Sequence, residues 1–115
     1  MKIITQKTYW HYGWCYVMME ENGNGSARLW FILNNETDKP FYEVYISDMF
    51  VDEEHRRKGI ATAIIEKSKE LYKQALDEKI IMTDLLAYVG NNSPEWLDKF
   101  YKKHDLLVKL YKEHT

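Results

Sequence analysis

Three consecutive cations stand directly before a glycine near the middle of the chain. The segment from Val51 to Ser68 reads VDEEHRRKGIATAIIEKS, and its RRK triplet precedes Gly59, where an amphipathic helix is predicted to begin. The first amide groups of a helix lack acceptors and its dipole is positive at that end, so the position favours anions. Phosphate is the common occupant of such a site. The cations Arg56, Arg57 and Lys58 therefore predict a local anion-binding loop.

The acidic residues just before the triplet support a plainer interpretation. Asp52, Glu53 and Glu54 could balance the three cations across a solvated loop, and on charge alone this interpretation is favoured. The formal net charge of the chain is -2, so no global field draws it toward nucleic acid or anionic lipid. A small nucleic-acid binder is disfavoured for that reason and because the chain has no wider basic face.

The composition is that of a soluble globular protein. The 115 residues are 45% hydrophobic and 30% charged, which suits one domain over residues 1–115 with a single core. No segment is apolar for long enough to span a bilayer, and the amino terminus lacks the apolar run of a signal peptide. The single cysteine, Cys15, lies among strand-like residues and is predicted to be a buried thiol. We therefore expect a cytoplasmic protein that does not bind membranes.

The first half of the chain is predicted to form strands. Residues 14–20, 27–34 and 41–51 are rich in aromatic and β-branched residues. The NGNG segment at 22–25 is a strong hairpin signal, because Asn and Gly tolerate the positive φ angles that its turn needs.

The second half shows helical spacing. From Gly59 onward apolar or small residues recur every three or four positions, at 60, 64, 68, 71 and 75. Asp84 to Val89 is predicted to be another strand, and a second helix is predicted with Ser93 as its N-cap and Pro94 as its first residue. Residues 106–115 fit either a strand or a helix. The order is β-β-β-α-β-α with an open tail, an α+β or mixed α/β fold.

The cations belong to a longer pattern. Met49-Phe50-Val51 ends a strand, a short acidic loop follows, and Arg56, Gly59 and Ala61 then have the spacing Arg-x-x-Gly-x-Ala. This string resembles the acyl-CoA binding motif of the GNAT superfamily of N-acetyltransferases. A weaker match lies downstream, where Phe100-Tyr101-Lys102-Lys103 resembles the family's aromatic-Tyr-x-Lys segment. Two motifs in the right order and separation favour this family over a chance match.

The resemblance implies a mixed, mostly antiparallel sheet flanked by helices, and a site for acetyl-CoA. In this family the strand end splays from the next strand, and its main chain pairs with the pantetheine arm. The amides of the loop and the Thr62 hydroxyl would hold the pyrophosphate, and Asn91 or Asn92 would bond the pantetheine amides, unless these two are only polar loop residues. The residues implied in cofactor binding are Met49, Phe50, Val51, Arg56, Arg57, Lys58, Gly59, Ile60, Ala61, Thr62 and Asn92.

Transfer of an acetyl group to an amine needs a base for the amine and an acid beside the departing sulfur. Tyr101 stands where the family usually keeps the acid, although it also fits an amphipathic helix as a core residue. For the base, the strand before the loop offers Asp48 and Glu43, and a bulge that is common in this strand prevents a choice by alternation. The four histidines have no metal-ligand spacing, so no metal is expected.

Several features depart from the family pattern. Residues 3–14 leave no room for the helices that usually build a wall of the acceptor site, and an aromatic group at residues 10–14 could replace that wall or simply edge the core. Asp105 stands where the family usually has Gly. About ten residues remain for a closing hairpin that is normally twice as long. The acceptor half is therefore reduced, and the cofactor half is intact.

The resulting hypothesis is a minimal N-acetyltransferase that uses acetyl-CoA and an amine acceptor, either a small molecule or a protein or peptide amine. The alternative is an inactive acyl-CoA-binding module that acts through protein interaction. A reduced acceptor half leaves apolar surface and sheet edges uncovered, so we also expect a homodimer.

Overall fold

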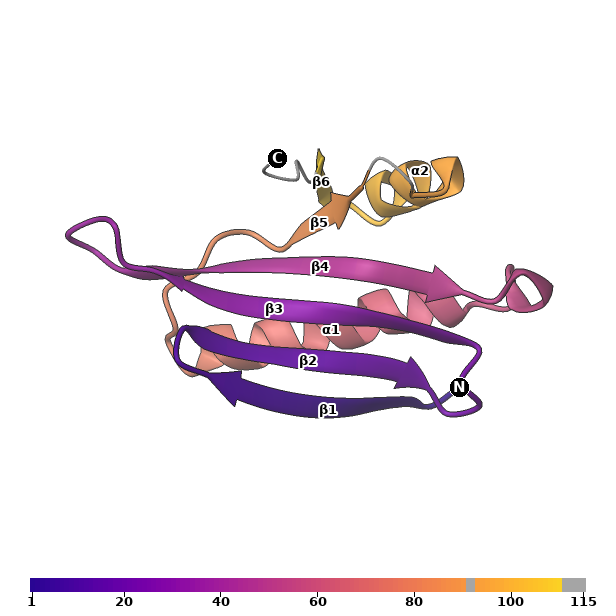
Figure 1. Cartoon of the computed structure of the whole chain (residues 1–115), viewed down its shortest axis with the longest axis horizontal. Helices are drawn as coiled ribbons and strands as arrows, with labels where there is room; N and C mark the ends of the chain where they lie inside the picture. Colours follow the sequence, from indigo (N-terminus) through magenta and orange to yellow (C-terminus); the bar gives the residue numbers. More distant parts are fainter. Residues whose placement is uncertain (91–92, 111–115) are drawn as a thin grey trace.

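The computed structural model describes residues 1–90 and 93–110, in which six strands form one sheet in the order β1-β2-β3-β4-β5-β6 (Figure 1). The three pairs of neighbours from β1 to β4 are antiparallel, whereas β5 and β6 continue the sheet in parallel. The mixed, mostly antiparallel sheet expected from the resemblance is thus confirmed. The strands are β1 (Ile3–Trp10), β2 (Gly13–Glu20), β3 (Gly25–Asn34), β4 (Phe41–Val51), β5 (Leu86–Val89) and β6 (Leu107–Leu110).

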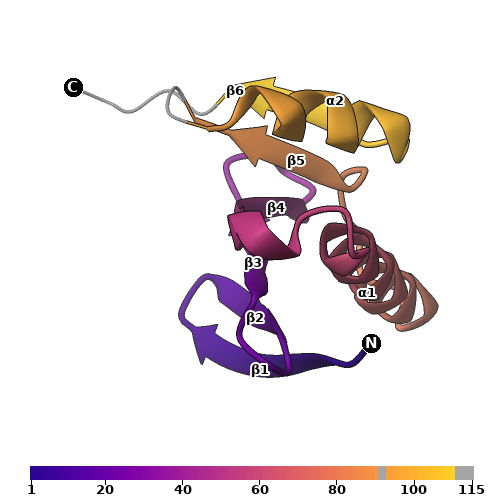
Figure 2. The ribbon, with the colours of Figure 1, turned by 90° about the vertical axis from the view of Figure 1, so that its right-hand side faces the viewer.

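Two helices make the crossovers between the parallel strands. The first, α1 (Ile60–Asp77), follows β4 after a short 3-10 turn, η1 (Glu53–His55), and the second, α2 (Glu95–Lys103), connects β5 to β6. Right-handed crossovers that advance in one direction put both helices on the same face of a sheet. Figure 2 shows α1 and α2 on one side of the sheet. No helix in the described ranges has the length and apolar character needed to cross a lipid bilayer.

The core lies between this face and the helices. Leu29, Phe31, Val44 and Ile46 point toward it and are 0% exposed. The predicted stripe of α1 meets them, with Ile64 and Ser68 also at 0% exposure. We call the other face of the sheet, which carries no helix in the described part of the chain, the bare face.

β1 is the strand that the sequence pattern did not reveal. Seven of its eight residues are exposed, so burial imposes no alternation on them. Trp10 pairs with Gly13 across a two-residue turn, and no helix intervenes before β2. The expected lack of room for extra helices is therefore confirmed, but the predicted strand order was wrong by one strand at its start.

Turns were predicted more accurately than helix ends. Gly23 takes a φ of +78° in the hairpin between β2 and β3, where its amide donates to the Glu20 carbonyl at 2.8 Å. The second helix begins one residue later than predicted: Pro94 is the N-cap, and the Ser93 hydroxyl instead accepts a hydrogen bond from the Gly90 amide at 2.8 Å. The predicted strand from Asp84 begins only at Leu86. Of the open tail, 107–110 forms β6, and residues 111–115 lie outside the described residues.

Both helices end in the same motif, with a residue in the left-handed conformation. After α1 this residue is Lys79 with φ +63°, and after α2 it is Asp105 with φ +61°. The Asp105 amide donates to the Lys102 carbonyl at 3.1 Å and the Leu106 amide to the Tyr101 carbonyl at 3.0 Å, the bond pair of a Schellman motif. The position that the family gives to Gly is thus one that needs positive φ.

Candidate active site

β4 and β5 separate in the middle of the sheet. Their ladder pairs Tyr45 with Leu86 and Ile46 with Ala87, and it extends no further in the described residues. Beyond it the last five residues of β4, from Ser47 to Val51, pair only with β3. The expected splay after this point of β4 is confirmed, and it leaves an edge of main-chain groups turned toward the gap.

A β-bulge lies at the start of this separated segment. Arg28 of β3 pairs with Ser47, but Ser26 pairs with Phe50, so Asp48 and Met49 together face a single residue of β3. Asp48 has a φ of +56°. The bulge turns Met49 and Val51 into the core and leaves Asp48 exposed on the bare face, next to Ser47, whose hydroxyl donates to its carboxylate at 2.8 Å. The parity reversal that prevented a choice by alternation is therefore present.

The loop after β4 presents unpaired amides. Gly59 is the N-cap of α1 with φ +81°, and no side chain caps the helix. Among the described residues, the amides of Arg57, Lys58 and Gly59 donate to no backbone or side-chain acceptor. The first helical amides, from Ile60 to Thr62, lack acceptors within the helix. A Cβ built on Gly59 would meet no heavy atom within 4 Å, so the loop opens outward at this point.

The three cations differ in their surroundings. The Arg56 guanidinium lies 5.5 Å from the ring centre of Trp96 on α2, and its Nε donates to the Val51 carbonyl at 3.4 Å. Arg57 and Lys58 are exposed. Arg56 therefore connects the loop to the end of β4 and to α2, whereas Arg57 and Lys58 form no ion pair with any residue that the structure describes. Trp96 was missed as a partner of this loop, because the two residues are distant in sequence.

Tyr101 is the most enclosed polar side chain near the gap. It is 0% exposed in the core cluster that includes Met49, Ala87 and Leu97, and its hydroxyl has no hydrogen-bond partner among the described residues. Burial, and then the nearby negative charge of Asp48, raise the pKa of this phenol above its ordinary 10.0. The hydroxyl is therefore protonated and able to donate at neutral pH.

The two carboxylates proposed as bases occupy different places on β4. Asp48 lies on the bulge, close enough to Tyr101 to affect its pKa. Glu43 accepts a hydrogen bond from Asn34 at 3.4 Å. Burial, and then the charge of Glu43, raise the pKa of Tyr88. Of the two carboxylates, Asp48 is thus the one that the fold brings toward Tyr101.

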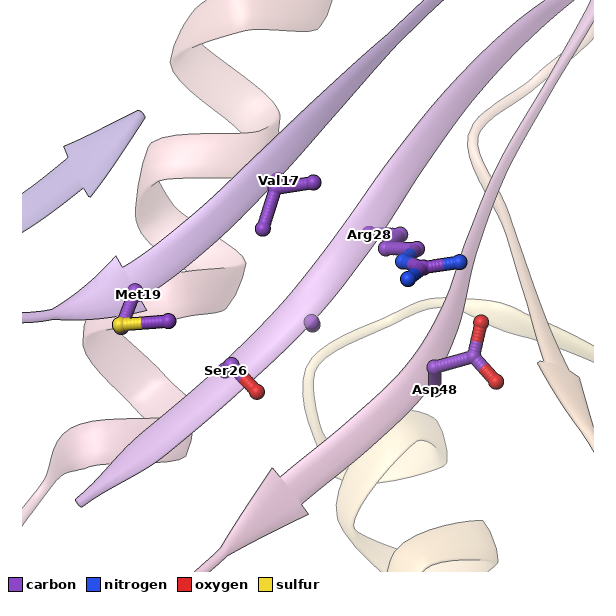
Figure 3. A pocket seen from close by; sticks show the side chains of 6 residues that line it. Val17, Met19, Ser26, Arg28 and Asp48 are labelled. Carbon is purple, nitrogen blue, oxygen red and sulfur yellow. The ribbon is translucent and has the colours of Figure 1, made fainter. Parts of the chain in front are cut away.

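A shallow groove of about 380 Å³ begins at Asp48 and runs across the bare face. Figure 3 shows Val17 and Met19 reaching it from β2, and Ser26 and Arg28 from β3. Arg28 was missed in the sequence, although the alternation of β3 gave a signal. It stands between the buried Ala27 and Leu29, so its side chain must leave on the opposite face.

Aromatic rings line the bare face beside the groove. The ring centres of Trp10 and Trp30 are 5.6 Å apart, those of Trp30 and Tyr45 are 6.3 Å apart, and those of Tyr45 and Tyr88 are 4.4 Å apart. Trp14 instead stacks on Phe31 at 4.7 Å on the helix side. The aromatic group at residues 10–14 is therefore divided: Trp10 joins the bare face, and Trp14 edges the core.

Three further expectations concern Cys15, the two asparagines at 91 and 92, and a metal site. Cys15 is buried at 6% exposure, as predicted, and burial raises the pKa of its thiol. Asn91 and Asn92, expected near pantetheine, lie outside the described residues. Residues 1–90 and 93–110 hold no group of three or more His, Cys, Asp or Glu side chains suited to a metal ion.

Comparisons with known proteins agree with this geometry. An acetyltransferase (GNAT) domain family model matches residues 11–105. No curated protein sequence is significantly similar to the chain.

Solved structures share the fold at low sequence identity. An aminoglycoside acetyltransferase from an uncultured soil metagenomic sample, in complex with trehalose, superposes with a TM-score of 0.60 at 18% identity over 92% of this chain. Glucosamine-6-phosphate N-acetyltransferase from Arabidopsis thaliana gives 0.56 at 14% identity over 89%. The chain spans 65% of the length of each of these proteins.

Proposed function

Because this chain belongs to the GNAT acetyltransferase family, we propose that it transfers an acetyl group from acetyl-CoA to a primary amine. One observation carries the proposal: the core cluster that includes Met49 of β4 and Ala87 of β5 encloses the Tyr101 hydroxyl, which has no hydrogen-bond partner among the described residues, and Asp48 is exposed on the neighbouring bulge. A purely structural tyrosine at 0% exposure would be expected to satisfy its hydroxyl.

Acetyl-CoA would bind along the separated part of β4. The unpaired edge from Met49 to Val51 suits the amides of pantetheine, and the open amides from Arg57 to Thr62 suit the pyrophosphate. Arg57 and Lys58 add charge there without competing ion pairs in the described residues. A charge-assisted hydrogen bond contributes about 1.5–3 kcal/mol, so several amides and two cations are sufficient for micromolar affinity.

The chemistry then divides between two side chains. The acceptor ammonium loses a proton to Asp48, directly or through water, and its nitrogen attacks the thioester carbonyl. The new C–N bond forms as the C–S bond breaks, and the sulfur takes the electron pair. Tyr101 gives its proton to the thiolate, and the second proton released by the nitrogen restores the phenol. The net products are the amide, free CoA and one proton.

The runner-up is an acyl-CoA-binding module without catalysis, and the shallowness of the groove that Asp48 lines is the observation in its favour. Release of free thiol from acetyl-CoA with a panel of amines separates the two. Thiol release with an amine supports the enzyme. Acetyl-CoA binding without release under any condition supports the module.

Cofactor binding is tested at Gly59. We expect Gly59→Glu to abolish acetyl-CoA binding in calorimetry, because a carboxylate would face the pyrophosphate. Gly59→Asn is the matched control, since Asn tolerates a positive φ and adds no charge. It should fold equally well and lose much less affinity. Unchanged binding by a folded Gly59→Glu protein would contradict the phosphate loop.

We further propose self-association through β1. Its outer edge pairs with no strand of the described residues, and Ile4 is 49%, Tyr9 68% and Trp10 37% exposed. Strands of this kind readily pair with another copy. Light scattering at high micromolar concentration should exceed the monomer mass of 13.9 kDa; the monomer mass alone would contradict the proposal. The cytoplasmic location expected from the single cysteine also stays a prediction.

A further inference from the structure

The groove on the bare face contains two opposite charges that do not pair with each other. Arg28 and Asp48 line it from the neighbouring strands β3 and β4. Neither takes part in an ion pair with any described residue. The Arg28 guanidinium also has no hydrogen-bond partner among these residues, whereas Asp48 accepts one from Ser47.

The fold itself gives Arg28 no evident role. Its two chain neighbours are buried under the helices, but its own side chain is exposed and can be replaced without disturbing the core. Val17 and Met19 form an apolar floor beside it, and the Ser26 hydroxyl supplies another donor along the same wall. Ligand sites combine an apolar floor with a few convergent polar groups in this way.

Building on the proposed function, we propose that the acceptor is an amine that also carries an anionic group, and that Arg28 binds that group. Asp48 lies at the end of the groove near Tyr101 and faces the ammonium, so the anion extends along β3 toward Arg28. A guanidinium binds carboxylate or phosphate through two parallel hydrogen bonds, which fixes orientation as well as charge. Both anions share this chemistry.

Pairs of acceptors that differ in one anionic group test the proposal. The phosphate pair compares glucosamine 6-phosphate with glucosamine, and the carboxylate pair compares L-leucine with L-leucinamide. In the pair whose anionic amine the wild type acetylates, Arg28→Gln should lower kcat/KM for that amine by about ten- to a hundredfold. For the amine without the anion, kcat/KM should stay within about twofold of the wild-type value. Arg28→Lys should retain part of the activity, because it keeps the charge and loses the bidentate geometry.

The control variant is Lys73→Gln. Lys73 is exposed on α1, away from the groove, so this substitution removes the same charge at a distant site. It should change neither member of a pair, which separates local recognition from net charge. An equal loss for both members in Arg28→Gln, or no preference of the wild type for an anionic acceptor in either pair, would overturn the proposal. So would a loss of acetyl-CoA affinity in Arg28→Gln.

The test also distinguishes this proposal from the proposed function. If no amine releases thiol although acetyl-CoA binds, acetyl transfer is wrong, and recognition is then measured directly. Calorimetry with the same four amines, in the presence of CoA, should still give binding of an anionic amine that Arg28→Gln abolishes. Absence of any such binding would overturn the role of Arg28 independently of catalysis.

Discussion

The covered and bare faces of the sheet differ most clearly within β3, where consecutive residues alternate between them. Leu29 and Phe31 are 0% exposed beneath α1, whereas Arg28 is exposed and Trp30 is half-buried. The indole of Trp30 donates to the Ser47 hydroxyl at 2.7 Å. The side chains of Leu29 and Phe31, on the covered side of the same strand, are apolar and form no such bond. The covered face of β3 thus belongs to the core, whereas Arg28 on the bare face is exposed and should be exchangeable at little cost to folding.

Tyr101 is the exception to this division. It lies on the covered face among core residues, but its hydroxyl is unsatisfied within the described structure. In the proposed mechanism this buried group serves chemistry on the other face, which requires an opening in the sheet, and the gap between β4 and β5 is the place where the described ladder ends.

The largest effect is expected from Tyr101→Phe, which tests this exception. Loss of a general acid typically lowers the rate by about 10²- to 10⁴-fold, so kcat should fall while KM stays nearly level. Stability should be unchanged or slightly raised, since no hydrogen bond is lost within the described fold. Steady-state kinetics and urea unfolding measure the two quantities. Wild-type turnover in the variant would end the assignment of Tyr101 as the acid.

Adjacent positions on β3 sharpen the comparison itself. Leu29→Ala should lower the free energy of unfolding by about 2–5 kcal/mol, because it leaves a cavity beneath α1. Arg28→Gln, one residue away on the bare face, should change it by less than about 0.5 kcal/mol. Urea denaturation of both variants provides the measurement. Similar losses for the two would mean that the bare face also carries the fold.

Alkaline pH should reveal the burial of Tyr101. Since the pKa of this phenol is raised above 10.0 in the folded chain, the neutral form is favoured by folding. Its contribution is complete below pH 10 and is lost as pH rises from there toward the raised pKa. The stability of the wild type relative to Tyr101→Phe should therefore fall above about pH 10. Urea unfolding of both proteins at a series of pH values provides the measurement. A difference in the free energy of unfolding that stays constant with pH would indicate that the phenol is not buried in solution.

A small gain in stability is expected at Asp105, in the turn that follows α2. Glycine adopts its φ of +61° without strain, so Asp105→Gly should raise the free energy of unfolding by about 0.5–1 kcal/mol. Asp105→Ala serves as the control and should give no gain. A destabilised glycine variant would mean that the aspartate side chain contributes more than the turn conformation.

Local chemistry made the loop at residues 56–62, the hairpin at 22–25 and the helix at 60–77 predictable. Their glycines and helical spacing are short-range signals. β1 was not predicted, because an exposed edge strand does not show the alternation of buried and exposed residues. The faces on which Asp48 and Glu43 lie could not be predicted either, since one extra residue in a bulge reverses which side chains share a face. The position of Arg28 beside Asp48 could not be predicted, because the two residues lie on different strands and meet in the groove only through the pairing of β3 with β4.

The order of strand pairing has a kinetic consequence. From β1 to β4 each strand pairs with the next one in sequence, so short hairpins close these contacts, whereas the whole of α1 lies between Tyr45 and its partner Leu86 in the sequence. Pairings between distant residues pay a larger loop-closure entropy before they are rewarded, and they form late. We expect β5 and α2 to assemble last and to open first, which makes their amides the fastest to exchange with solvent. A ligand in the gap would therefore also close the last-formed part of the fold, and its affinity would appear as added resistance to unfolding.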